Sequence, residues 1–338
     1  MRARDLGIRV GEGTPAPLNA ITDVKGVRVG HSTLIEGDDV RTGVTVVVPP
    51  AVPHFAGSHC LNGNGELTGL AWVEESGLLT TPVGLTNTHS VGVVRDALVA
   101  AVSATDSRWH LPVVGETWDG LLNDINGFHV KSEHVFEALD AASEGAVAEG
   151  NVGGGTGMIC HGFKGGIGTA SRVADGYSVG VLVQANHGRR PRLQVNGVPV
   201  GRELGPDRIP LPPRPQTGGS IIVLAATDAP LLPHQCERLA QRAALGIART
   251  GGAGENSSGD FVLAFATGNA GLAEERETIS LSMLPNERLD FLFYAVIEAT
   301  EEAIVNALLA ADTMTGKGGT VHRLDPGAFA AVLSASAT

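Results

Sequence analysis

Residues 251–270, GGAGENSSGDFVLAFATGNA, combine residue types that can do chemistry. A glycine-rich run and the adjacent hydroxyls of Ser257 and Ser258 are followed by an apolar, strand-like segment. Glycine permits the positive-φ backbone in which a hydroxyl can attack the preceding carbonyl, and the apolar segment can hold the reacting residues still. A serine freed by such a cut carries an α-amino group that can accept its hydroxyl proton. The segment predicts either this self-cleavage junction or a polar β-turn before a core strand.

A second candidate is Asn186, which ends the apolar run of VGVLVQANHGRR. An amide at the end of a buried strand can donate a hydrogen bond to an oxyanion as it develops in a reaction. Asparagine is equally ordinary as a turn residue. Both interpretations stay open for Asn186 from the sequence.

The segment VVGETWDGLLNDINGF contains three acidic residues, Glu116, Asp119 and Asp124. They can bind the ammonium group of a substrate, or they can belong to an exposed loop with helix caps. Trp118 and Phe128 lie in the same segment, where they can line an apolar pocket or pack in the core.

Several familiar site patterns are not matched. The glycine-rich residues 150–172 lack a Walker motif, because Lys164 is followed by glycine and not by serine or threonine. The 11 histidines form no HExxH pattern, and His129 and His134 are five residues apart, off a common helix face. A GxSxG elbow for a serine triad is also missing. We therefore expect no nucleotide and no metal.

Composition limits the function classes. The 338 residues are 43% hydrophobic and 18% charged and include 46 glycines, which suits one large folded domain over residues 1–338. A net charge of −12 argues against a nucleic-acid or membrane-surface partner. Cys60, Cys160 and Cys236 are odd in number, far apart and form no CxxC pair, and residues 1–13 lack the apolar core of a signal peptide, so we expect a cytoplasmic location.

Strand and helix patterns alternate in blocks along the chain. Strands are predicted at residues 21–31, 44–48, 177–185, 220–226 and 261–265, and helices at residues 67–75, 91–102, 135–148, 231–249 and from Asn286 to about Thr313. Such blocks, without strict βαβ units, indicate a layered α+β sandwich.

Ten ordered blocks carry a resemblance to a known family. They are ITDVKGVRVGHST, LNGNGELTGLAWVEESGLL, TPVGLTNTHSVGVV, EGNVGGGTGM, FKGGIGTASR, VGVLVQAN, GVPVGREL, SIIVLAATDAPLLPHQ, NSSGDFVLAF and EATEEAIVNAL. The chain resembles the DmpA family of self-processing aminopeptidases, peptidase family S58, which includes D-stereospecific and β-peptidyl aminopeptidases. The match runs from about residue 5 to residue 319.

The resemblance implies the architecture and the assembly. It implies a four-layer αββα sandwich of the N-terminal-nucleophile type, shared with ornithine acetyltransferases. It further implies cleavage into a large chain of about residues 1–257 and a small chain of residues 258–338, and a homotetramer of these cleaved heterodimers.

Site residues follow from the same resemblance. The family's serine before Gly-Asp matches Ser258, with Ser257 as the second choice for the cleavage site, and the oxyanion asparagine matches Asn186. The family's tyrosine is matched by His161, a departure that changes the pKa and reach of the donor. A hydroxyl and carboxylate pair aligns with Thr300 and Glu302, although residues two apart on a helix point in nearly opposite directions.

The chemistry expected from this set is hydrolysis without a cofactor. The hydroxyl of Ser258 would form the acyl-enzyme. The α-amine of Ser258, acting directly or through Thr300, would be the general base. His161, Glu116 and Asp119 would contact a short peptide, amide or ester substrate. The alternatives are an acyltransferase of the ornithine-acetyltransferase type, which passes the acyl group to an amine, and an inert ligand-binding sandwich.

Overall fold

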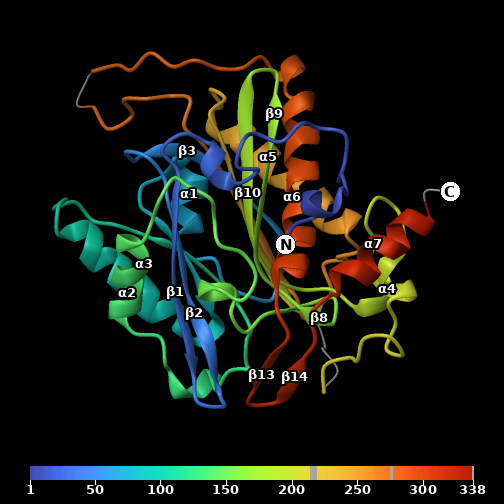
Figure 1. The fold of residues 1–338 in the computed structure, drawn as a ribbon. Helices are drawn as coiled ribbons and strands as arrows, with labels where there is room; N and C mark the ends of the chain where they lie inside the picture. Colours follow the sequence, from blue (N-terminus) through green and yellow to red (C-terminus); the bar gives the residue numbers. More distant parts are fainter. Residues whose placement is uncertain (214–218, 275–276, 337–338) are drawn as a thin grey trace.

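The computed structural model describes residues 1–213, 219–274 and 277–336. Its strands form two main sheets (Figure 1). The larger sheet has the order β4 (Leu78–Leu79), β3 (His54–Gly63), β12 (Gly259–Ala266), β11 (Ser220–Thr227), β10 (Tyr177–Asn186) and β9 (Gly166–Ala174). The smaller sheet has the order β1 (Arg28–Glu36), β2 (Val40–Val48), β5 (Val83–Asn87) and β6 (Val113–Thr117). Two-stranded ribbons are formed by β7 (Ile159–Cys160) with β8 (Phe163–Lys164) and by β13 (Met314–Gly316) with β14 (Gly319–Val321).

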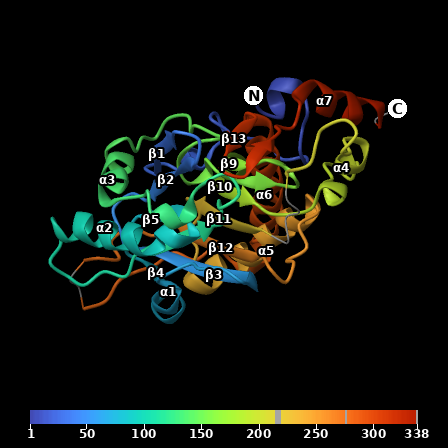
Figure 2. The ribbon, with the colours of Figure 1, turned by 90° about the horizontal axis from the view of Figure 1, so that it is seen from below.

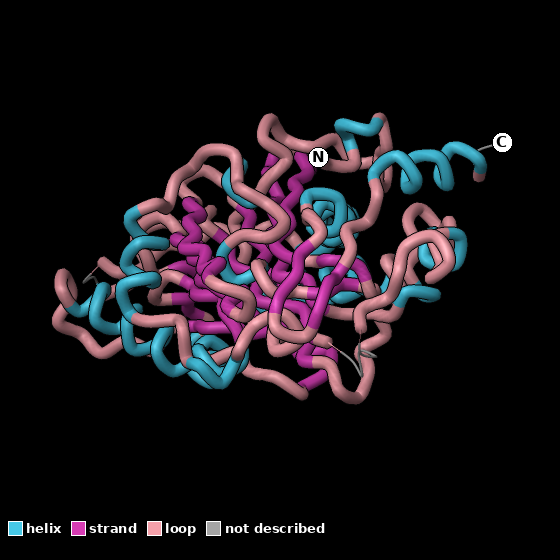
Figure 3. Tube along the Cα trace, turned by 60° about the horizontal axis from the view of Figure 1, so that its bottom comes forward, coloured by secondary structure: helices cyan, strands magenta, loops and turns pink. Residues whose placement is uncertain are grey.

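Helices lie around these sheets, as Figure 3 shows for most of them. The α-helices are α1 (Leu70–Ser76), α2 (Val91–Ser103), α3 (Ser132–Asp140), α4 (Val200–Glu203), α5 (Pro233–Arg249), α6 (Asp290–Ala310) and α7 (Pro326–Ala335). Short 3₁₀ helices cover Arg4–Leu6, Ile21–Asp23, Thr88–Ser90, Ile125–Gly127, Gly153–Gly155, Arg190–Arg192 and Asn286–Arg288. Among the described residues, each helix is too short or too polar to cross a lipid bilayer.

The two sheets face one another across a buried apolar layer. This layer joins Val47 and Leu85 of the smaller sheet to Leu182, Leu224 and Leu263 of the larger sheet. Strands β10, β11 and β12 are therefore buried on both faces, which explains why their sequences are almost continuously apolar.

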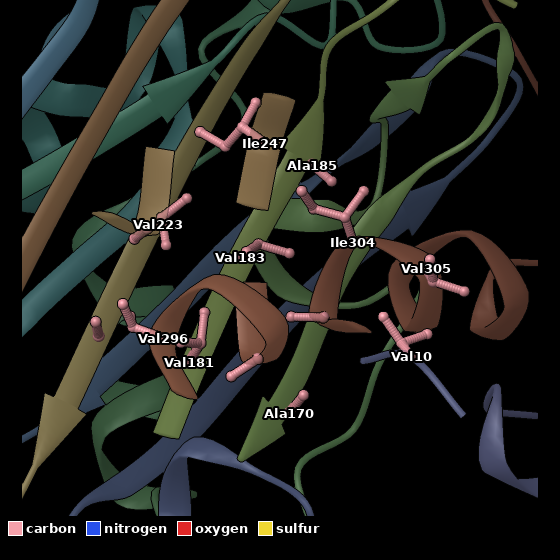
Figure 4. Packing of buried hydrophobic residues seen from close by; sticks show 14 of the residues in the cluster. Val10, Ala170, Val181, Val183, Ala185, Val223, Ile247, Val296, Ile304 and Val305 are labelled. Carbon is pink, nitrogen blue, oxygen red and sulfur yellow. The ribbon is translucent and has the colours of Figure 1, made fainter. Parts of the chain in front are cut away.

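Helices cover the outer face of each sheet, and Figure 2 shows the layers from below. The helices α2 and α3 pack on the smaller sheet through Val94, Leu98 and Val135. On the larger sheet, Val296 and Ile304 of α6 pack against Val181 and Val183 of β10 (Figure 4). The order helix, sheet, sheet, helix confirms the four-layer αββα sandwich.

Several predicted elements end in different places in the structure. Residues 21–27 form a 3₁₀ helix and a turn, so the first strand begins only at Arg28. The helix predicted at residues 135–148 ends at Asp140, because Ser143 instead pairs with the backbone of Val29. The strands β3, β5, β6 and β9 were not predicted, and each contains glycine or polar residues that weaken its apolar pattern.

One edge of the larger sheet collects four chain segments. Strands β11 and β12 are parallel and begin there, with Ser220 beside Gly259. Strands β10 and β3 run in the opposite direction and end there, with Asn186 beside Ser220 and Gly63 beside Gly259. The register thus brings Asn186, the 62–65 turn and the Ser257–Ser258 junction to the same edge.

Candidate functional site

Ser258 lies directly before β12 and is 3% exposed. Its Oγ donates a hydrogen bond to Oδ1 of Asp260 at 2.5 Å. Its backbone nitrogen donates to the carbonyl oxygen of Glu255 at 2.7 Å, which closes a tight turn. Ser257, by contrast, is exposed. The structure thus gives the buried hydroxyl of Ser258 a carboxylate partner.

Asp260 is the second residue of β12. Side chains alternate along a strand, so residues 258 and 260 point to the same face. Burial, with a smaller contribution from the charge of Glu255, raises the pKa of Asp260 to about 6, although hydrogen bonds from Ser258 and Ile221 act in the opposite direction. This carboxyl is therefore ionised at neutral pH and can accept a proton from Ser258.

Two asparagines at the end of β3 hold the backbone of the junction. Nδ2 of Asn64 donates to the carbonyl oxygen of Ser257 at 3.0 Å. Nδ2 of Asn62 donates to the carbonyl oxygens of Ser258 and, at 3.1 Å, Glu255. The carbonyl of the Ser257–Ser258 peptide bond therefore faces an amide donor.

A cavity of about 700 Å³ opens beside the junction. Its lining includes Asn64, Glu116, Trp118, Asn186 and Ser257. Backbone approach is close here, since a Cβ on Gly65 would lie 2.7 Å from Oε1 of Glu116 and 3.1 Å from Cα of Gly259. The size suits a small molecule or the first residues of a peptide.

Glu116 supplies the cavity with a buried carboxylate. One oxygen accepts a hydrogen bond from Thr88 Oγ1, and the other accepts from the backbone nitrogen of Glu66 at 3.1 Å. Burial raises the pKa of Glu116, and the hydrogen bonds from Thr88 and Glu66 oppose that rise. Such a group is suited to bind a substrate ammonium, which would compensate its buried charge.

Asn186 also lines the cavity, at the end of β10. Its Oδ1 accepts from the backbone nitrogen of Ile159 at 2.7 Å, and its Nδ2 donates to the carbonyl oxygen of Trp118 at 3.0 Å. These two bonds fix the orientation of the amide. A side-chain amide has two donor hydrogens, so one remains for an oxyanion.

The other acidic residues of the segment after β6 have different surroundings. Asp119 is buried and accepts a hydrogen bond from Asn123 Nδ2 at 3.1 Å, and burial raises its pKa to about 7. Asp124 forms an ion pair with Lys317. Neither lines the cavity of Glu116, so the structure does not bring the three acids together.

The two aromatic residues of this segment also have different surroundings. Trp118 is 47% exposed and lines the cavity. Phe128 is 56% exposed and stacks on His89, with ring centroids 6.1 Å apart. Of the two, Trp118 is therefore the one placed to contact a substrate.

His161 is fully buried and does not line the cavity. Its backbone nitrogen donates to the carbonyl oxygen of His187 at 2.7 Å, and its Nδ1 lies 3.2 Å from the carbonyl oxygen of Arg189. Burial lowers the pKa of His161 to about 4, so the ring is neutral at pH 7. In this arrangement the ring holds the 187–189 loop and is not open to substrate.

His161 belongs to a buried cluster with Cys160 and His187. Among the described residues, these three offer potential metal-ligand atoms that all lie within 4.8 Å of one another. The guanidinium of Arg190 lies beside the cluster, with its Nε donating to the carbonyl oxygen of His161 at 3.1 Å. A divalent cation would face this buried positive charge, and we assign no metal to the cluster.

Thr300 and Glu302 lie on α6, and neither lines the cavity of Glu116. Thr300 Oγ1 donates to the carbonyl oxygen of Val296 at 2.7 Å. Glu302 accepts hydrogen bonds from Arg172 at 2.7 Å, Arg4 at 2.9 Å and Asn19 at 2.6 Å. The structure therefore places this predicted pair in helix packing and in a buried ion cluster, and does not bring it to Ser258.

Asn64 and Asp260 are two residues of the site that the sequence patterns do not identify. A signal for Asp260 was present, because a carboxylate two residues after Ser258 on a strand must share its face. Asn64 carried a weaker signal, the NGNG turn, and its contact with Ser257 spans 193 positions of the chain.

Known proteins match this chain over most of its length. The model of the family described as peptidase family S58 matches residues 19–322. Beta-peptidyl aminopeptidase BapA of Sphingosinicella microcystinivorans is 51% identical, with 98% of this chain and 91% of that protein aligned. The BapA of Sphingosinicella xenopeptidilytica is 46% identical over 93% of this chain and 86% of its own length.

Solved structures give the same result. A beta-aminopeptidase from a Burkholderia species superposes with a TM-score of 0.93, 56% identity and 99% coverage of both chains. A second match is the L-aminopeptidase D-Ala-esterase/amidase of Ochrobactrum anthropi, described as a prototype serine aminopeptidase and a variant of the Ntn hydrolase fold. It superposes with a TM-score of 0.90 and 43% sequence identity, and 99% of each chain is covered. These matches favour an aminopeptidase over an acyltransferase or an inert sandwich. The chain is an aminopeptidase of the DmpA type and belongs to peptidase family S58.

Proposed function

We propose that this aminopeptidase cuts its own chain between Ser257 and Ser258 and then uses Ser258 as an N-terminal nucleophile. The observation that carries the proposal is the buried Oγ of Ser258, 2.5 Å from a carboxylate and next to a cavity that contains Glu116. Cutting at this bond gives a large chain of residues 1–257 and a small chain of residues 258–338. Ser257 stays the second choice for the first residue of the small chain.

In the cleaved enzyme, the new α-amine of Ser258 is the base that takes the hydroxyl proton during attack on a substrate carbonyl. The remaining amide hydrogen of Asn186 stabilises the tetrahedral oxyanion, an effect of about 3 kcal/mol for one good donor. The leaving amine departs, and water hydrolyses the acyl-enzyme. No step in this sequence needs a cofactor.

Substrates are short peptides, amides or esters with a free N-terminal amine. Glu116 binds the ammonium group, and Trp118 covers the side chain beside it. The names of the two BapA relatives and of the Burkholderia enzyme support N-terminal β-amino acids as the preferred residues. The Ochrobactrum enzyme's name adds D-alanine esters and amides as a class to compare.

Assembly and location complete the proposal. We expect a homotetramer of cleaved heterodimers in the cytoplasm. Exposed apolar residues, Ile279, Leu281 and Met283, lie on the segment that extends from the body between β12 and α6 (Figure 1), and they support a subunit contact. The three cysteines are free thiols, which fits a reducing compartment.

The test is the Ser258→Ala variant assayed on p-nitroanilides of β-homoglycine and L-alanine. The proposal expects wild-type protein to hydrolyse the β-substrate faster, and the variant to remain one chain and to lose hydrolysis of both. Hydrolysis by Ser258→Ala at the wild-type rate would place the nucleophile elsewhere. A faster rate on L-alanine would overturn the β-residue preference alone.

A further inference from the structure

We propose that Asp260 and Asn64 form the self-cleavage centre of the uncleaved chain. Asp260 takes the proton from Ser258 Oγ, and Asn64 stabilises the oxyanion that develops on the carbonyl of Ser257. The inference rests on the proposed function of Ser258. It assigns the first cut to a base and an oxyanion donor that differ from those of substrate hydrolysis.

The uncleaved chain needs a base other than the Ser258 amine. Before the cut, the nitrogen of Ser258 belongs to a peptide bond and donates to the carbonyl oxygen of Glu255 at 2.7 Å. It has no basic lone pair with which to accept a proton. The Oγ of Ser258 instead donates to Oδ1 of Asp260, at a distance suited to proton transfer.

Asp260 is held in place for this role. It belongs to β12, which lies between β11 and β3 in the larger sheet, and the residue is 2% exposed. A carboxylate so buried has lost most of its hydration, which strengthens its attraction for the hydroxyl proton. The rigid strand keeps the distance from Oδ1 to Ser258 Oγ fixed.

Asn64 is placed to donate a hydrogen bond to the oxyanion of the self-cleavage step. Its Nδ2 donates to the carbonyl oxygen of Ser257 at 3.0 Å, and this carbonyl is the one that Ser258 attacks. Its backbone nitrogen donates to the carbonyl oxygen of Ser258 at 3.2 Å, which fixes the asparagine to the junction from both sides. The Nδ2 of Asn186 donates instead to the carbonyl oxygen of Trp118 at 3.0 Å, so Asn64 is the asparagine in contact with the carbonyl of Ser257.

The step balances in atoms and charge. The Oγ of Ser258 bonds to the carbonyl carbon of Ser257 as its proton moves to the carboxylate of Asp260. The tetrahedral intermediate collapses, the bond from that carbon to the nitrogen of Ser258 breaks, and the nitrogen takes up the proton that Asp260 held. The product is an ester between Ser257 and Ser258 Oγ, which water hydrolyses to a new carboxylate and a free Ser258.

The experiment follows cleavage of the full chain after cell-free synthesis stopped by chloramphenicol. Asp260→Asn removes the proton acceptor at nearly constant shape and is expected to slow cleavage about 10²–10⁴-fold. Asn64→Asp removes the amide donor and is expected to slow it about 10²–10³-fold. Thermal unfolding of each uncleaved variant establishes that it has folded.

Two controls carry the same chemical changes elsewhere. Asp228→Asn alters a half-buried carboxylate at the opposite end of the sheet, where it accepts from the nitrogen of Ser178 at 2.7 Å. Asn151→Asp alters another amide that donates to a main-chain carbonyl, that of Asp312 at 2.9 Å. Both are expected to cleave at the wild-type rate.

A second measurement distinguishes a role of Asp260 as the base from a purely structural role. It uses wild-type protein, so it stays valid if Asp260→Asn fails to fold. Wild-type cleavage is measured from pH 5 to pH 8. Asp260 must be ionised to accept the proton, and its pKa lies near 6, so the rate should rise through pH 6 and level off above it. The titratable neighbours that couple to Asp260 are Glu255 and Cys60. Burial, together with the charges of Asp260 and Glu74, raises the pKa of Cys60, so its thiol stays protonated over this range.

The outcomes distinguish the two proposals. Cleavage of Ser258→Ala would defeat the proposed function itself. If Ser258→Ala stays intact while folded Asp260→Asn and Asn64→Asp cleave at the wild-type rate, the nucleophile stands and this inference is wrong. Hydroxylamine adds a check, since it releases the small chain from an accumulated ester. Release from Asp260→Asn would show that the carboxylate acts after ester formation and would overturn its role as the first base.

Discussion

Two neighbouring serines at residues 257 and 258 have the same side chain and different surroundings. Ser257 is exposed, whereas Ser258 is buried and bound to Asp260. Local pattern does not separate them, because both follow a glycine-rich run and precede the same strand, and the preference for Ser258 came from the family resemblance. The structural difference arises from strand alternation, which turns residue 258 toward the face of Asp260.

Glu116 gives a prediction at this scale about substrate recognition. Glu116→Gln keeps the shape and the acceptor for Glu66 but loses the charge that binds an ammonium group. We expect KM for amino-acid amides to rise at least tenfold while kcat changes little, because binding shared by ground and transition states is lost. Steady-state kinetics on a purified, cleaved variant measures both constants.

The control is Asp124→Asn, which neutralises a nearby acid that pairs with Lys317 outside the cavity. Its KM should match that of the wild type. Equal kinetics of the wild type on N-acetylated and free-amine amides would show that no ammonium group is recognised, and would contradict the role of Glu116.

The turn after β3 is the element that brings the asparagines to the junction. A Cβ on Gly65 would lie 2.7 Å from Oε1 of Glu116 and 3.1 Å from Cα of Gly259. We expect Gly65→Ala to push the turn away from β12, and to slow both self-cleavage and hydrolysis by at least tenfold. The appearance of the small chain and the turnover of a p-nitroanilide measure the two effects.

Gly63→Ala, in the same turn, is a matched control. The nearest atom to a Cβ there is Cys60 Sγ at 3.5 Å, an ordinary contact. This variant should cleave and turn over like the wild type. If both alanine variants behave alike, close approach at Gly65 has no part in forming the site.

Helix α6 gives a prediction about stability. The buried guanidinium of Arg172 pairs with Glu302 at 2.7 Å and with Glu298 at 3.1 Å, so Glu302→Gln removes one of its two charge partners and should cost about 1.5–3 kcal/mol of unfolding free energy. Thr300→Val keeps the shape of a side chain that bonds within its own helix. The kcat of both variants, per folded enzyme, should stay near that of the wild type.

Thermal unfolding and active-site titration separate stability from turnover. A wild-type melting temperature combined with a large loss of kcat in either variant would restore the pair to a catalytic role. The sequence placed the two residues on one helix, and it also showed that they point apart. What it did not show is the pairing of Glu302 with Arg4 and Arg172, which come from distant parts of the chain.

At the scale of the whole molecule, the sequence predicts the layers better than the site. The apolar runs that become β10, β11 and β12 are strong signals because both faces of these strands are buried. The site forms where they meet the end of β3, a strand with a mixed pattern that was not predicted. Asn64 contacts Ser257 because β3 pairs with β12 in the sheet, and the local sequence patterns do not predict this pairing.

After the cut, the larger sheet would hold the large and the small chain together. Strand β12, which the proposed cut would place in the small chain, lies between β11 and β3, which would belong to the large chain, and α6 packs on β9 and β10. This arrangement explains how a cut before β12 can free the amine of Ser258 without separating the chains.

The most direct test of the account is the intact mass of the purified protein together with N-terminal sequencing of its small chain. The account predicts two chains, residues 1–257 and 258–338, with the small chain beginning Ser-Gly-Asp-Phe. A start of Ser-Ser-Gly-Asp would transfer the nucleophile to Ser257 and contradict the role given to the contact between Ser258 and Asp260. A single chain of 338 residues with full aminopeptidase activity would contradict the central claim that self-cleavage creates the nucleophile.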